Sequence, residues 1–229
     1  MKLGKRLATI AALVPPGSSL ADIGTDHAYL PVYLVSEGLV PRAIAGEVNP
    51  GPFAAAGEAL ARVGLADRVS LRFGDGLTIL VAGEVDTVVI AGMGGLTIIE
   101  ILAARPEVTG SLKRLILQPM QAAAPLRRWL AENGWRLVAE ALVEEDGRLY
   151  EVMAAEPGLV EAYEPILDDI GPLLWARRHP LLKDHLAALL AQANKVAAEM
   201  AASPQAASSA KYREYLAKIS QLEAKHACL

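Results

Sequence analysis

Between residues 18 and 119 the sequence alternates short apolar stretches, rich in β-branched residues, with longer stretches of helical periodicity. The apolar stretches lie at residues 18–24, 42–48, 68–76, 86–95 and 113–119, and their ends carry glycine, acidic residues or proline. Strands that alternate with helices form a parallel sheet that the helices cover on both faces. Because crossovers between parallel strands are right-handed, the pattern predicts a doubly wound α/β sheet.

The pattern changes after residue 135. In WRLVAEALVEEDGRLYEVMAAE, two alternating stretches flank Asp146-Gly147, which is a strong signal for a β-hairpin. A parallel sheet that finishes with an antiparallel hairpin is typical of class I methyltransferases, whereas a dinucleotide-binding Rossmann domain would end with a parallel strand. The predicted fold class is therefore α/β, with a class I methyltransferase Rossmann-like sheet.

From about residue 158 the sequence predicts only helices. Residues 165–179 and 180–202 each begin with a proline at a position that a first helical turn tolerates, and a third helix begins near Ser209. Apolar residues recur at three-four spacing in the last two helices, and SPQAASS can turn the chain between them. We therefore predict a catalytic domain at residues 1–157 and an all-α domain, an antiparallel coiled coil, at residues 158–229.

Composition narrows the classes of protein that this chain can belong to. Its 229 residues are 53% apolar, which is enough for a buried core. The single cysteine, Cys228, excludes an internal disulfide framework and a cysteine-based zinc site, and it suits a reducing cytosol. No apolar run approaches the roughly 20 residues of a membrane helix.

The first residues predict an amphipathic helix that ends before Pro15-Pro16. Its apolar positions fall on one face, and Lys2, Lys5 and Arg6 fall largely on the other. The apolar stretch is too short for a typical secretory signal. The net charge of −4 argues against a general nucleic-acid coat but leaves room for local basic clusters, at the N-terminus, at Arg127-Arg128 and at residues 177–178.

Acidic residues follow the first three predicted strands: Asp22, Glu47 and Asp75. Ligands of open α/β sheets bind beyond the carboxyl ends of the strands. A carboxylate after the second strand suits a ribose diol, one after the third suits an adenine amino group, and the neighbouring glycines let the backbone approach a ligand. Any single acid of this kind can be a helix cap or a solvated turn residue, but together the three predict an adenosine site.

The stretch DIGTDHAYLP distinguishes between two candidate ligands that contain adenosine, NAD and S-adenosylmethionine. A dinucleotide fingerprint, G-x-G-x-x-G, needs space for a pyrophosphate, but the residue two positions after Gly24 is Asp26. A carboxylate would repel pyrophosphate, whereas the ammonium and sulfonium of S-adenosylmethionine suit an acidic turn. The methyl donor is therefore favoured over NAD.

Two further turns bear on the methyl acceptor. The stretch NPGPF at residues 49–53 resembles the loop of amine methyltransferases, but it follows the second strand instead of the fourth, so we interpret it mainly as a helix start. The fourth strand leads into AGMGG, which has no acid or amide side chain to hold an exocyclic amine. A ring-nitrogen acceptor fits this turn better, although a ligand-adjacent turn with no acceptor role would look the same.

The chain resembles the bacterial TrmK family in a series of motifs that run in order over about residues 1–155. They are KRLATIAALVPPG, DIGTDHAYLP, AGEVNPGPF, GDGL, AGMGG, LILQP, LRRWLAENGW and EEDGRLYEVM. Members of this family transfer a methyl group from S-adenosylmethionine to N1 of adenine 22 in tRNA. The resemblance implies this cofactor, a tRNA partner and a coiled-coil C-terminal domain.

The expected site follows from the strand ends together with the resemblance. The catalytic candidates, between methyl donor and tRNA, are Asp26, which would stabilise the cationic product, His27 and Tyr29. Gln118 is a further candidate for contact with the edge of the base. The expected cofactor-binding residues are Asp22, Gly24, Thr25, Asp26, His27, Glu47, Val48, Asn49, Asp75, Gly76, Leu77, Ala91, Gly92, Met93 and Gly94.

The remaining expectations concern the partners. We expect no metal and no membrane, a cytoplasmic location, and a monomer or weak homodimer. The N-terminal basic cluster and the helical tail would hold the tRNA, although the tail can instead serve dimerisation or stability. Three other functions stay open: a small-molecule methyltransferase with an oligomerising helical arm, a non-catalytic sensor, and an NAD-dependent oxidoreductase, which Asp26 disfavours.

Overall fold

The computed structural model describes residues 2–229, so Met1, the first residue of the predicted catalytic domain, lies outside the described residues. The chain divides into two compact units, Met1–Val160 and Glu161–Leu229.

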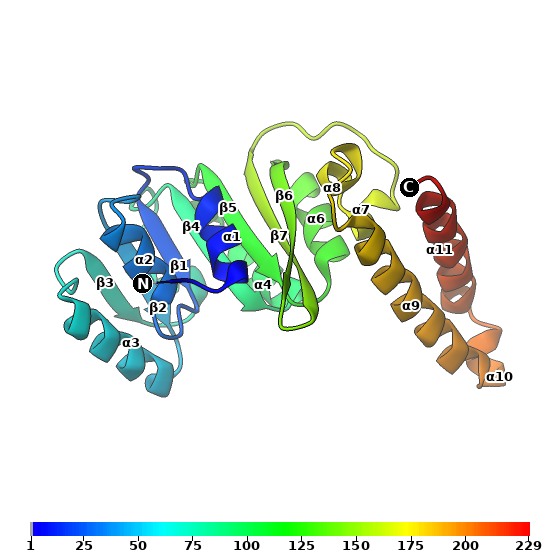
Figure 1. Ribbon diagram of the computed structural model, residues 1–229, viewed down its shortest axis with the longest axis horizontal. Coiled ribbons are helices and arrows are strands. Elements are labelled where there is room, and N and C mark those ends of the chain that lie inside the picture. The colour runs from blue at the N-terminus through cyan, green and yellow to red at the C-terminus, as the bar shows by residue number, and fades with distance from the viewer. Residues whose placement is uncertain (1) are drawn as a thin grey trace. The chain divides into compact units, whose positions relative to one another are not determined.

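A seven-stranded sheet forms the centre of the first unit (Figure 1). Its strands are β1 (Leu20–Ile23), β2 (Ala43–Glu47), β3 (Val69–Phe73), β4 (Thr87–Met93), β5 (Arg114–Pro119), β6 (Trp135–Glu145) and β7 (Arg148–Pro157). The order is β3–β2–β1–β4–β5–β7–β6, with β1 to β5 parallel and the β6–β7 hairpin antiparallel. The predicted class I arrangement is confirmed.

Helices cover both faces of this sheet (Figure 1). One face carries α1 (Lys5–Leu13), α2 (Tyr29–Ser36) and α3 (Pro50–Val63), and the other carries the 3₁₀ helix η1 (Gly76–Ile79), α4 (Gly95–Ala104), α5 (Pro106–Thr109) and α6 (Ala123–Glu132). Strand β4 shows why both faces are apolar. Val89 packs toward α1–α3, while Val88 and Ile90 pack toward α4–α6, because side chains alternate along a strand.

The two ends of the first unit agree with the sequence patterns. Helix α1 ends at Leu13, before Pro15-Pro16, and its residue Ile10 is buried. At the hairpin, Asp146 and Gly147 both have positive φ, 51° and 71°, as the short turn between two strands requires.

Arg127 departs from the predicted basic surface cluster. Its side chain is 1% exposed, and its Nε donates to Glu140 Oε1 over 2.7 Å while Nη2 donates to Glu151 Oε2 over 2.5 Å. Burial favours the neutral guanidinium, but the carboxylates of Glu151 and Glu140 outweigh it and raise the pKa of Arg127 above its ordinary value. Arg127 therefore joins α6 to the hairpin as a buried ion pair.

The second unit is helical, as predicted, with α7 (Leu167–Ile170), α8 (Pro172–Ala176), α9 (Leu182–Ala201), α10 (Pro204–Ala207) and α11 (Ala210–Ala227). The single helix expected over residues 165–179 is wrong. Gly171 adopts φ 99°, and Pro172 has no N–H to continue the helix, so the chain breaks there into α7 and α8.

The last two long helices pack side by side and run in opposite directions around α10 (Figure 1). Their contact face holds the predicted stripes: Leu186 and Ala193 of α9 and Ile219 and Leu222 of α11 are buried. Ser209 begins α11, where its hydroxyl accepts a hydrogen bond from the Tyr212 N–H. Coiled-coil packing in the strict sense stays a prediction.

Candidate active site

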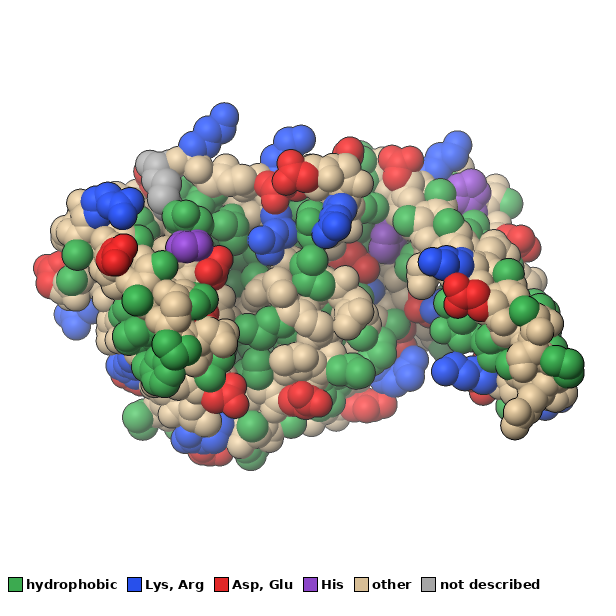
Figure 2. Space-filling model, turned by 90° about the horizontal axis from the view of Figure 1, so that it is seen from below, with side chains coloured by type: hydrophobic (Ala, Val, Ile, Leu, Met, Phe, Trp, Pro, Cys, Tyr) green, Lys and Arg blue, Asp and Glu red, His purple; other side chains and the backbone are tan. Residues whose placement is uncertain are grey.

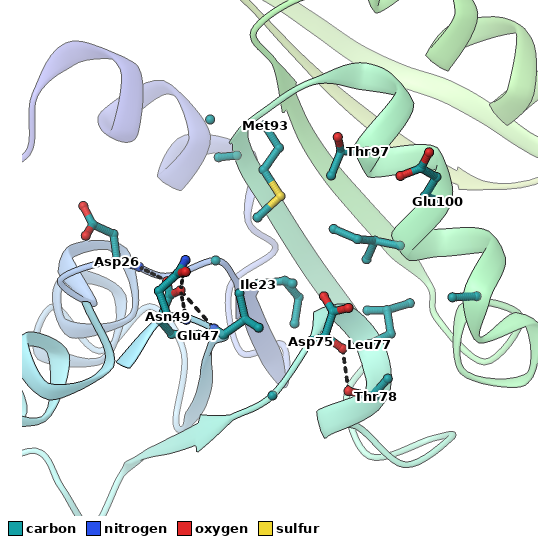
Figure 3. Close-up of a pocket in the computed structure, with 18 of the residues that line it drawn as sticks. Ile23, Asp26, Glu47, Asn49, Asp75, Leu77, Thr78, Met93, Thr97 and Glu100 are labelled. Atoms are coloured by element: carbon teal, nitrogen blue, oxygen red, sulfur yellow. Dashed lines mark hydrogen bonds between the residues drawn. The ribbon is translucent and has the colours of Figure 1, made fainter. Parts of the chain in front are cut away.

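A cavity of about 640 Å³ lies at the carboxyl ends of β1 to β4, where the strand order reverses between β1 and β4 (Figure 3). This position is where open α/β sheets bind ligands. The structure brings together most of the predicted cofactor-binding residues on its walls. They are Gly24, Asp26, Glu47, Val48, Asn49, Asp75, Gly76, Leu77, Ala91, Gly92 and Met93.

Four of the predicted cofactor-binding residues and the catalytic candidate Tyr29 do not line the cavity, and they differ in burial. Asp22 and Thr25 are each 6% exposed, and the Thr25 hydroxyl donates to Asp22 Oδ2 over 2.7 Å. Burial of the Asp22 carboxyl raises its pKa to about 6; Thr25 opposes this shift and the charge of Glu47 adds to it. His27, Tyr29 and Gly94 are the other three.

Glu47 holds two loops of the site in place. Its Oε1 accepts hydrogen bonds from the backbone N–H groups of Val48 and Asn49, at 2.9 and 2.8 Å, and from Asn49 Nδ2 at 3.0 Å. Its Oε2 accepts a longer bond, 3.3 Å, from the Asp26 N–H. The carboxylate at the end of β2 therefore ties the loop after β1 to its own loop (Figure 3).

Within DIGTDHAYLP, residues 26–28 form a turn that leads into α2, and the side chains of Asp26, His27 and Tyr29 face outward. Asp26 and Ala28 both have positive φ, 51° and 55°, a conformation that aspartate tolerates better than most residues. The His27 ring stacks on Tyr29 with centroids 5.4 Å apart, and His27 Nε2 lies 3.6 Å from Asp26 Oδ1. The three side chains are 66%, 46% and 49% exposed in the order Asp26, His27, Tyr29, so they are available to a large ligand.

The AGMGG turn brings the backbone close to the cavity. Gly92 is the extra residue of a β-bulge between Ala91 and Met93, with φ 76°. The Met93 side chain points into the cavity (Figure 3). It lies against Gly24, where an added Cβ would be 2.2 Å from Met93 Cε. The φ of 74° favours glycine at position 24, whereas the Met93 methyl group is the end of a flexible side chain and could move away from an added Cβ.

Helix α4 supplies residues that the sequence did not predict. Thr97, Glu100, Ile101 and Ala104 line the cavity, together with Pro52 and Thr78. The sequence predicts the loops that follow the strands, but the rotation of α4 about its axis decides which of its residues face the cavity. The Thr78 hydroxyl donates to the carbonyl of Asp75 over 2.5 Å, so η1 closes directly on the loop after β3 (Figure 3).

The charge of the cavity is one-sided. Asp26, Glu47, Asp75 and Glu100 all line it, and no lysine or arginine is present among its described lining residues. Such a wall favours a cationic ligand and repels a phosphate.

Two expectations about nearby polar residues are wrong. Gln118 is fully buried, and both ends of its side-chain amide have partners within the protein, so it has no free edge for a base. Arg6 does not point into solvent with Lys2 and Lys5, because its guanidinium donates to Gln118 Oε1 over 2.7 Å.

Within residues 2–229, no group of three or more His, Cys, Asp or Glu side chains is placed to hold a metal ion. Over the same residues, no helix is both long and apolar enough to cross a membrane.

The comparisons with known proteins agree with this geometry. Residues 3–153 match a family model described as a methyltransferase domain. The tRNA (adenine(22)-N(1))-methyltransferase of Bacillus subtilis is 46% identical over 158 residues, which are 69% of this chain and 66% of that protein. The chain thus matches slightly less than two thirds of the length of this curated relative.

Two solved structures extend the match to nearly the whole chain. The crystal structure of the B. subtilis m1A22 tRNA methyltransferase TrmK has a TM-score of 0.83 at 36% identity, covering 99% of this chain and 96% of that one. Sp1610 of Streptococcus pneumoniae, in complex with S-adenosyl-L-methionine, has a TM-score of 0.84 at 31% identity, covering 98% and 100%. The chain belongs to the TrmK family of methyltransferase-domain proteins.

Proposed function

We propose that this protein transfers the methyl group of S-adenosylmethionine to N1 of adenine 22 in tRNA. The observation that carries the proposal is the cavity at the strand-order reversal, with four carboxylates and no lysine or arginine among its described lining residues. This wall suits a donor with an ammonium and a sulfonium and disfavours a dinucleotide. The activity for which the B. subtilis relative is named, and the donor bound to the S. pneumoniae relative, support the same assignment.

The donor would be held by the predicted residues that line the cavity. Glu47 would accept from the ribose hydroxyls and Asp75 from the adenine amino group, with Val48 and Asn49 beside the adenine ring. Asp22 and Thr25 lie behind the wall, so we assign them the role of shaping the turn at Gly24. His27 and Gly94 would contact the donor only at the margin of the cavity.

The acceptor adenine would meet the exposed side chains of Asp26, His27 and Tyr29. When bound, the donor supplies an electrophilic methyl group on a sulfonium. The lone pair of adenine N1 attacks this methyl group while the bond between methyl and sulfur breaks. The positive charge thereby moves onto the base, and the Asp26 carboxylate at the mouth of the cavity would stabilise it. The stacked His27 and Tyr29 rings present a surface on which a displaced base can pack.

The glycine-rich wall supports a ring nitrogen as the acceptor. Residues 91–95 provide backbone groups and the Met93 thioether but no acid or amide that could hold an exocyclic NH₂. Adenine N1 carries no proton that must leave before attack, so positioning next to the donor suffices.

A methyl-transfer assay with two transcripts tests the proposal. An unmodified tRNA transcript with adenine at position 22 should acquire radiolabel from tritiated donor, and mass spectrometry should locate 1-methyladenosine there. The matched transcript with guanine 22 should acquire none. No transfer to any tRNA would refute the proposal, and labelling of small metabolites instead would favour the small-molecule methyltransferase.

Substitution of Asp26 separates an enzyme from a sensor. Asn is the cleaner replacement than Ala, because Asn tolerates the φ of 51° at this position. Asp26→Asn should lower kcat more than it weakens donor binding. Unchanged turnover would remove Asp26 from catalysis, and absence of turnover in the unaltered protein would favour a non-catalytic sensor.

The second domain, residues 158–229, would hold the tRNA. The protein would act on tRNA in the cytoplasm, as a monomer or weak homodimer. On the face shown in Figure 2, basic and acidic side chains of the described residues are interspersed. This mixture favours recognition of the tRNA by its shape, and not by a broad basic surface. Charge reversal of Lys211 and Arg213, both exposed on α11, should raise KM for tRNA and leave donor affinity unchanged. An unchanged KM would count against this role.

A further inference from the structure

An arginine of the N-terminal helix reaches the carboxyl end of the sheet. Arg6 Nη1 donates to Gln118 Oε1 over 2.7 Å, and the guanidinium carbon lies 5.5 Å from the centroid of the Tyr150 ring. Arg6 Nε is 3.9 Å from Glu145 Oε2, and the Arg6 N–H donates to Glu145 Oε1 over 3.2 Å. With its side chain 27% exposed, Arg6 is held among three groups of β5, β6 and β7.

These contacts set the orientation of the Gln118 amide. Its Oε1 accepts from Arg6 and also from the Gly92 N–H at 3.1 Å, while its Nε2 donates to the Pro119 carbonyl at 3.0 Å. A guanidinium can only donate, so the oxygen end must face it. The opposite orientation would turn the NH₂ group toward two donors and leave the Pro119 carbonyl without this bond.

Gln118 Oε1, which Arg6 orients in this way, accepts a hydrogen bond from the backbone N–H of Gly92. Gly92 is the extra residue of the bulge in β4, so its N–H falls outside the regular ladder with β5, and the Gln118 side chain replaces the missing partner. Gly92 and Met93 line the cavity, and Met93 in turn packs against Gly24. The orientation of one buried amide therefore bears on the wall where methyl transfer would occur.

We propose that Arg6 is a positioning residue of the transfer site: it holds the Gln118 amide in the orientation that accepts the Gly92 N–H, and so fixes Gly92 and Met93 at the cavity wall. The consequence for turnover rests on the proposed function, whereas the consequence for the Gly92 N–H does not.

The first experiment needs no substrate. In the full ¹⁵N-labelled chain, Arg6→Met keeps the aliphatic stem but removes the donors, and should shift the Gly92 amide resonance and speed its hydrogen exchange about tenfold. Gln118→Met should do the same with Arg6 in place. The matched control is Arg114→Met: Arg114 is 22% exposed and also contacts α1, at the Leu13 carbonyl, but it does not contact Gln118. A Gly92 amide that Arg6→Met leaves unchanged would overturn the proposal, whatever Gln118→Met does.

The second experiment separates positioning from tRNA binding. Arg6→Met should lower kcat about tenfold and leave KM for tRNA within twofold, and adding it to Gln118→Met should cost nothing more, because Arg6 acts through Gln118. A phosphate contact would instead raise KM and reduce the salt dependence of tRNA binding, with kcat unchanged. That result, or additive losses in the double variant, would overturn the proposal.

Discussion

The Thr25 hydroxyl donates a 2.7 Å hydrogen bond to the carboxylate of Asp22, and both side chains are buried at the carboxyl end of β1. Despite this bond, burial dominates and raises the pKa of Asp22 from 3.8 to about 6. We expect Asp22→Asn to increase the free energy of unfolding at pH 8 by about 2–3 kcal/mol, because the amide is not charged and still accepts from Thr25.

The pH dependence of this gain has a definite sign. In the unaltered protein, the folded state protonates Asp22 more readily than the unfolded state does. The stability that this protonation gives the unaltered protein is complete below pH 3.8 and is lost as pH rises through about 6. Denaturant titrations should show that the advantage of Asn appears between pH 4 and 6 and is constant above. The exposed Asp75, which follows β3, gives the control, Asp75→Asn. An advantage that is largest at pH 4 would contradict the prediction.

Glu47→Gln should weaken donor binding about 10- to 100-fold, as measured by titration calorimetry. The amide keeps only one acceptor oxygen where the carboxylate now serves Val48, Asn49 and Asp26, and it loses the charge for the ribose hydroxyls. Glu37→Gln, at an exposed position after α2, is the control and should bind normally. Normal affinity in Glu47→Gln would remove this residue from the donor site.

Two glycines in first helical turns should respond oppositely to alanine. At Gly95 an added Cβ would lie 2.3 Å from the Ala122 carbonyl oxygen, so the backbone must move, and Gly95→Ala should lower the free energy of unfolding by about 2–3 kcal/mol. At Gly51 nothing lies within 4 Å, so Gly51→Ala should be neutral or stabilise by up to about 1 kcal/mol. Thermal and denaturant unfolding measure both, and equal effects would contradict the close approach at Gly95.

Arg127→Met should lower the free energy of unfolding by about 3–5 kcal/mol, because it leaves the buried Glu140 carboxylate without its charged partner. The exposed neighbour gives the control, since Arg128→Met should change stability by less than about 1 kcal/mol. Denaturant unfolding at pH 7 distinguishes the two. A small loss in Arg127→Met would mean that water or a rearranged partner satisfies Glu140.

The sequence predicted the parts of the site that depend on chain order. Glu47 and Asp75 were expected at one rim because they follow parallel strands, and both line the cavity. Glu100 was not expected, because its place depends on how α4 is rotated against the sheet. The break at Gly171-Pro172 had a local signal, since this dipeptide interrupts helices. The helix boundaries were instead predicted from the prolines at residues 165 and 180.

Two arginines show why side-chain partners were harder to predict. Helical periodicity placed Arg6 on a basic face, and the adjacent charges of Arg127 and Arg128 were interpreted as a basic surface cluster. Each is instead held by groups far away in sequence, Arg6 by Gln118 and Arg127 by carboxylates of the hairpin. Such pairings depend on tertiary packing, which the period of a single helix does not contain.

The contact between Arg6 and Gln118 has a consequence for biosynthesis. Arg6 leaves the ribosome early, but Gln118 follows it by 112 residues and Glu145 by 139. At about 5–20 residues per second, that interval lasts from several to about thirty seconds. The cavity residues themselves extend to Ala104, so a nascent chain has made all of them before it makes Gln118 and Glu145. The contacts of Arg6 are therefore among the last to form around the cavity, and they are complete only when the hairpin joins the sheet.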